Sequence, residues 1–175
     1  MAVALDLWET IAQEAADESK LWAEALKPEP EREPVFSPLG EERYAVGLET
    51  IYEGYLLHYG RPRLFAPVDE DTALLLGDYL YAHGLVRIAE AGPVEAVTDL
   101  AALISLCAQL RADGLPGDGP AWAATAAVLG AEALDGAREA LRLRGDLGPL
   151  VEAARAAAGD GAVERSLALH LGRVG

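Results

Sequence analysis

The chain has 175 residues, 51% of them apolar and 6% aromatic, and its 29 acidic against 14 basic residues give a formal net charge of -15. This length predicts one domain with a sizeable core. The acidic balance argues against nucleic acid and anionic membrane surfaces as partners, because clustered Lys and Arg hold phosphate groups. The sequence contains no apolar run long enough to span a membrane and no signal-peptide pattern at its start, so we expect a cytoplasmic protein.

The first predicted element is an amphipathic helix over residues 2–26, within an N-terminal helical arm of residues 1–27. Its apolar and small side chains recur every three or four residues and form one stripe: Leu5, Trp8, Ala12, Ala15, Ser19, Trp22 and Leu26. Because two tryptophans on one stripe need a substantial partner surface, Trp8 and Trp22 are interface candidates. Two interpretations stay open: the arm packs on its own chain, or it forms a seam between two copies.

Residues 28–37 are predicted as a linker and residues 38–175 as a helical domain. Three prolines between positions 28 and 34 forbid a helix and favour an extended chain that lets the arm swing away. Ser37 and Pro38 are typical of a helix start. Glycine and proline then divide the domain into helices over residues 38–59, 69–91, 93–112, 120–144, 149–158 and 162–171.

The predicted fold class is all-α, a bundle of about seven helices, because no segment alternates in the manner of a strand. Gly77 and Asp78 fall in the middle of one predicted helix. A glycine there costs about 1 kcal/mol relative to alanine, and we expect it to let a second helix come close. Asp78 is predicted to make a structural polar contact, for which tyrosine hydroxyls are candidates.

Few residues carry recognisable chemistry. Glu49 and Glu53 lie four apart on one face of a predicted helix, which suits either a weak divalent-cation site or a solvated face. The three histidines share no ligand spacing, and Cys107 lies in an apolar segment where we expect a small buried group. The sequence contains no phosphate-binding loop and no zinc or di-iron helix motif, so no catalytic residue is assigned.

Several segments, in their order along the chain, resemble the trans-type isoprenyl diphosphate synthases. Gly60-Arg61-Pro62 followed by a helix with Gly77-Asp78 is similar to the family's RRGxP turn and its A-x-L-x-G-D-x-L helix. The segment 104–110 with Gln109 resembles the helix that ends in a GQ signature, and residues 124–131 resemble the K-T-A-x-L helix. The likeness covers residues 48–144 and implies a truncated isoprenyl-synthase fold, magnesium as cofactor and a lipid diphosphate as substrate.

The residues that would carry the family's chemistry are largely replaced. Its first metal motif falls on residues 49–53 and keeps only Glu49 and Glu53, with Thr50 in place of an aspartate. The basic residues that hold diphosphate are replaced by His58, Tyr59 and Ala124. Leaving-group ionisation needs metal ions and basic groups, so the resemblance predicts a member that has lost prenyl transfer.

The resulting prediction is a non-catalytic, isoprenyl-synthase-like protein without a cofactor. It would be a regulatory or accessory subunit that acts through a protein partner or as a homo-oligomer. One alternative is a divergent magnesium-dependent enzyme on prenyl diphosphates that uses Glu49, Glu53 and Asp78. The other is a helical interaction module unrelated to that family.

Overall fold

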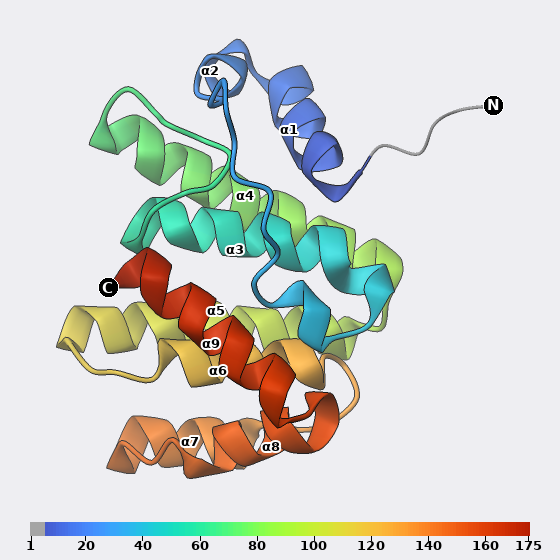
Figure 1. Ribbon diagram of the computed structural model, residues 1–175, viewed down its shortest axis with the longest axis vertical. Helices are drawn as coiled ribbons and strands as arrows, with labels where there is room; N and C mark the ends of the chain where they lie inside the picture. Colours follow the sequence, from blue (N-terminus) through green and yellow to red (C-terminus); the bar gives the residue numbers. More distant parts are fainter. Residues whose placement is uncertain (1–5) are drawn as a thin grey trace.

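The computed structural model describes residues 6–175, and within that range it confirms the all-α prediction: helices are present and strands are not (Figure 1). Its elements in chain order are α1 (Leu7–Glu18), α2 (Lys20–Glu24), the 3-10 turns η1 (Ser37–Leu39) and η2 (Glu42–Tyr44), α3 (Ala45–Tyr59), α4 (Glu70–Ala91), α5 (Val94–Asp113), α6 (Asp118–Ala127), α7 (Asp135–Arg144), α8 (Gly148–Ala158) and α9 (Asp160–Val174). None of these helices has both the length and the apolar character needed to cross a membrane.

The helices are stacked along the long axis of the molecule (Figure 1). The antiparallel pair α3 and α4 lies between the α1–α2 arm on one side and α5, α6 and α9 on the other, with α7 and α8 at the far end. The main core is centred on Trp122 of α6, whose ring stacks on Phe36 at 5.5 Å between centroids and meets Tyr52 and Tyr55 edge-on. A smaller apolar cluster joins the arm to α3 and α4.

The N-terminal arm packs on its own chain. Trp8 and Ile11 of α1 are buried in the smaller cluster, and Trp22 stacks on Tyr79 of α4 at 5.9 Å between ring centroids. The single helix predicted over residues 2–26 is wrong, because Ser19 adopts an extended conformation and its hydroxyl caps the separate helix α2. Leu5, the first residue of the predicted stripe, lies outside the described residues.

The segment after the arm is tied to the loop that follows α3. The Lys27 amide donates to the Leu64 carbonyl at 2.8 Å, and the Glu31 amide donates to the Arg63 carbonyl at 3.1 Å. Val35 and Phe36, at the end of this segment, are buried in the main core. In this structure the predicted linker therefore fastens the arm to the body.

The helix predicted over residues 38–59 begins only at Ala45. Gly40 is extended and comes so close to α6 that a Cβ at this position would lie 2.4 Å from the Ala126 carbonyl oxygen. This contact turns the chain away from helical geometry. Ser37 makes no capping hydrogen bond with its side chain; its amide donates instead to Glu49.

The helix predicted over residues 120–144 is two helices. Gly130 has a φ of +69°, which favours glycine and reverses the chain between α6 and α7. The Asp99 carboxylate of α5 accepts the Gly130 amide at 3.0 Å and holds the turn. The break was not predicted because the segment is rich in alanine, which favours helix. By contrast, α4 matches its prediction, with Asp69 accepting the Thr72 amide at 2.8 Å as the N-cap.

Glycines bring the α3 and α4 backbones together, as predicted for Gly77. A Cβ on Gly77 would lie 3.2 Å from the Gly54 carbonyl oxygen, and a Cβ on Gly54 would lie 2.8 Å from the Gly77 carbonyl oxygen. Seven residues along each helix, Gly47 and Gly84 repeat the arrangement. This spacing keeps both contacts on one seam.

We expect Gly54→Ala to lower the free energy of unfolding by about 1–3 kcal/mol, because the new methyl group would meet backbone that has no rotamer with which to move aside. Gly136→Ala is the matched control. A Cβ there meets nothing within 4 Å, and alanine favours the α7 helix by up to about 1 kcal/mol. Urea unfolding followed by circular dichroism measures both. Equal shifts for the two variants would contradict the packing explanation.

Candidate functional site

The two candidate metal ligands of the sequence, Glu49 and Glu53, lie together on α3 with their side chains fully buried. Both face Arg63, which is also fully buried. Arg63 Nη1 donates to Glu49 Oε2 at 2.6 Å, and Arg63 Nε donates to Glu53 Oε2 at 3.0 Å. The two carboxylates therefore share one guanidinium of this chain as their counter-ion.

The remaining carboxylate oxygens accept backbone amides. Glu49 Oε1 accepts those of Val35 and Ser37 at 3.1 and 2.9 Å. Glu53 Oε1 accepts those of Arg63 and Leu64, each at 2.7 Å. The pair thus fastens two loops to α3, and rings on both sides enclose its counter-ion: the Arg63 guanidinium carbon lies 4.7 Å from the centre of the Trp8 ring and 5.0 Å from that of Tyr52.

The other motif positions serve packing and capping. Asp78 is not enclosed in apolar surroundings, since its side chain is 72% exposed, and its neighbour is His58 Nε2 at 3.1 Å rather than a tyrosine hydroxyl. Gly60 ends α3, and a Cβ there would lie 2.9 Å from the Arg173 carbonyl oxygen of α9. Arg61 reaches the same helix end, where its guanidinium donates to the Gly172 carbonyl. Pro62 accepts from the Lys27 ammonium at 2.6 Å.

A second buried polar cluster joins α3, α5, α6 and α9. The Asp118 carboxylate accepts from the Tyr55 hydroxyl and from Arg111, and its Oδ2 lies 3.2 Å from His170 Nε2. The other ring nitrogen of His170 lies 2.9 Å from the Tyr52 hydroxyl. Asp118 and Tyr52, which both contact His170, are 52 and 118 positions away from it in the sequence. No motif has such a spacing, so sequence reasoning missed the cluster.

Electrostatics in this cluster favour a charged Asp118. Burial alone would raise the pKa of its carboxyl group, but hydrogen bonds from His170 and Tyr55 and the charge of Arg111 together hold the pKa well below its usual value of 3.8. Cys107 lies nearby and is buried as predicted, which raises the pKa of its thiol. Among the described residues, no three His, Cys, Asp or Glu side chains are grouped so that they could hold a metal ion.

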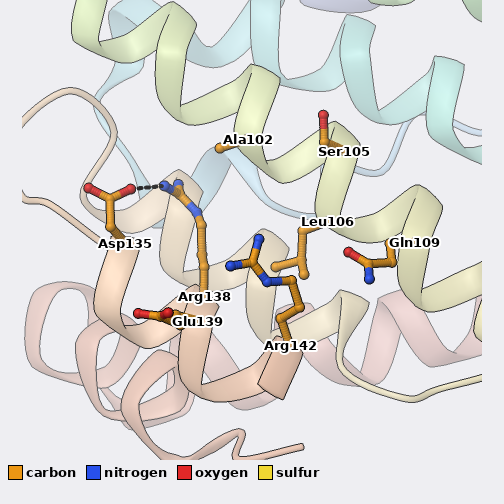
Figure 2. Close-up of a pocket in the computed structure, with 8 residues that line it drawn as sticks. All are labelled: Ala102, Ser105, Leu106, Gln109, Asp135, Arg138, Glu139 and Arg142. Atoms are coloured by element: carbon orange, nitrogen blue, oxygen red, sulfur yellow. Dashed lines mark ion pairs between the residues drawn. The ribbon is translucent and has the colours of Figure 1, made fainter. Parts of the chain in front are cut away.

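A pocket of about 370 Å³ separates α5 from α7 (Figure 2). From α5 it is lined by Ala102, Ser105, Leu106 and Gln109, and from α7 by Asp135, Arg138, Glu139 and Arg142. Each set lies on one helical face. Arg138 is buried and bonds to Asp99 of α5 at 3.3 Å, while Arg142 is exposed one turn further along. Gln109, singled out for its motif position, therefore faces a pocket.

The outward sides of α4 and α5 each contain a stripe of uncharged residues, and we call the two stripes together the α4–α5 face. Its residues follow one helical stripe on each helix: Leu75, Tyr79, Ala82, Val86 and Ala89 on α4, and Val94, Thr98, Ala101, Ser105, Ala108 and Ala112 on α5. Leu75, Val86 and Val94 are 59%, 54% and 71% exposed. Neither stripe contains a charged residue, but exposed carboxylates border the α4 stripe: Asp71 and Asp78 lie within one turn of Leu75, and Glu90 lies one turn after Val86.

Comparison with known proteins does not assign this chain to a family. No protein-family model, no curated protein and no solved structure matches the chain. The likeness to isoprenyl diphosphate synthases therefore depends on the sequence segments alone.

Proposed function

We propose that this chain is a non-catalytic, isoprenyl-synthase-like helical protein that acts through protein association, and that the α4–α5 face binds a second copy. The exposure of Leu75, Val86 and Val94 on two uncharged helical stripes carries the proposal. Contiguous exposed apolar surface on a protein of this size marks an interaction site. The assembled protein would serve as an accessory or regulatory subunit.

The absence of charge on the face favours a second copy as its occupant. A net charge of -15 opposes self-association in general, but none of that charge lies on the two stripes that would meet. In a dimer with a two-fold axis, the same face of each subunit is buried against the other, so one type of surface is enough. At about 1.5 Å per residue, α4 and α5 are each roughly 30 Å long. A standard interface buries roughly 800 Å² per partner, which is the area that such a dimer would need.

The non-catalytic part of the proposal is supported by the carboxylates that the resemblance would assign to magnesium. Glu49 and Glu53 are bonded to Arg63 and to four backbone amides. Binding a metal ion would require them to release a buried guanidinium, which would then lack a partner at a cost of several kcal/mol. These residues support the fold, and the surface carries the function.

We expect the wild-type chain to be a dimer at micromolar concentration and Val86→Asp to be a monomer, because the new carboxylate would be buried against its own symmetry mate. Val68→Asp is the matched control, since Val68 is 84% exposed but lies in the loop before α4, outside the α4–α5 face. Native mass spectrometry and sedimentation equilibrium measure the mass, and circular dichroism checks the fold. A strictly monomeric wild type, or equal dissociation in both variants, would overturn the proposal.

A further inference from the structure

The α5–α7 pocket is lined by several polar side chains that make no stabilising contact within the described part of the chain. Within residues 6–175, the side chains of Ser105, Gln109 and Arg142 make no hydrogen bond or ion pair, yet all three line this pocket. Arg138, at its buried wall, leaves its Nε–H without a partner among the same residues. Pockets that bind small molecules typically combine a few convergent polar groups with an apolar lining, here supplied by Ala102 and Leu106.

The charges of the pocket are separated along its length. In Figure 2, Arg142 and Gln109 lie on one side, Asp135 lies on the other, and Arg138 stands between them. Arg138 already faces two carboxylates, Asp99 at 3.3 Å and Asp135 at 3.8 Å. Arg142 is therefore the cation left for a ligand.

The acidic end continues into a second pocket. This neighbour has a volume of about 300 Å³, shares Ala102, Asp135 and Arg138 with the first, and adds the carboxylates of Glu95 and Glu132. The combined groove thus has a guanidinium and an amide at one end and an excess of carboxylates at the other. A simple anion would meet repulsion at the far end, and a simple cation would leave Arg142 unpaired.

We propose that this groove binds a small dipolar molecule with a carboxylate at one end and a protonated amine at the other, of the size and class of L-lysine. The carboxylate would accept hydrogen bonds from Arg142 and Gln109, since guanidinium groups bind carboxylates through paired donors. The aliphatic part would lie along Ala102, and the ammonium would face Glu95 and Glu132. This proposal does not rest on the proposed function, although Val94, Thr98 and Ser105 line the groove and also belong to the α4–α5 face.

Isothermal titration calorimetry of the full chain with L-lysine tests the proposal. We expect saturable binding in the millimolar range or tighter, weakened at least about tenfold in Arg142→Gln, because a charge-assisted pair to the carboxylate is lost. Arg144→Gln is the matched control, because Arg144 is exposed on the same helix and lies outside the lining. It should bind as the wild type does. Cadaverine, which keeps both amines but lacks the carboxylate, should bind at least about tenfold more weakly than L-lysine.

Three results would overturn the proposal. The first is the absence of saturable heat with L-lysine. The second is equal weakening in Arg142→Gln and Arg144→Gln, which would indicate only a general charge effect. The third is cadaverine binding as tight as that of L-lysine, which would mean that the acidic residues alone attract cations.

Discussion

Arg63→Met is expected to lower the free energy of unfolding by about 3–5 kcal/mol, the largest effect we predict. Methionine keeps most of the side-chain volume but removes the guanidinium that faces Glu49 and Glu53, so that two carboxylates stay buried without a counter-charge. The cation–π contacts of the guanidinium with the Trp8 and Tyr52 rings are lost as well. Urea unfolding followed by circular dichroism measures the loss.

Two further variants separate charge from packing. Arg165→Met is the surface control, since Arg165 is exposed and its contact with Glu33 at 3.6 Å is a surface pair of about 1 kcal/mol or less. Adding Glu49→Gln and Glu53→Gln to Arg63→Met should restore part of the stability, because the uncompensated charges disappear. A loss no larger than that of Arg165→Met would show that the buried ion cluster does not matter for stability.

Asp118→Asn is expected to lower the free energy of unfolding at neutral pH by about 2–3 kcal/mol. An amide would keep the shape but lose the charge that Arg111, Tyr55 and His170 surround. The contacts of α9 with α3 and α6 depend on this cluster, so local opening of α9 should also increase. Hydrogen exchange of the α9 amides measures that opening.

The effect of Asp118 should depend on pH with a defined sign. Because the pKa of its carboxyl group is lower in the folded than in the unfolded chain, its contribution is fully present above the ordinary pKa of 3.8 and is lost as the pH falls below it. The stability difference between wild type and Asp118→Asn should therefore be constant from pH 7 to about 5 and narrow in more acidic buffer. Asp113→Asn, at an exposed position at the end of α5, should show no such difference. If the stability difference between wild type and Asp118→Asn stayed constant below about pH 5, Asp118 would not have the lowered pKa described here.

Features that depend on neighbours in sequence were predictable. Asp69 caps α4 through an amide three residues away, and Gly92 follows its last residue, so both limits of that helix were correct. The close approach at Gly77 followed from the rarity of glycine in helix interiors. The spacing of Glu49 and Glu53 correctly placed both carboxylates on one face of a helix, although it did not identify Arg63 as their counter-ion.

Local sequence alone determined that this chain is helical, where α4, α5, α8 and α9 begin and end to within a few residues, and which residues share a face, because periodicity and capping act over one or two turns. Tertiary structure decided the rest. The break at Gly130 needs Asp99 from another helix, the ion cluster needs Arg63 from a loop, and Asp118 meets His170 across 52 residues. Such contacts exist only after the helices have packed, and no spacing rule encodes them. The same packing leaves Leu75, Val86 and Val94 exposed and forms the pocket between α5 and α7.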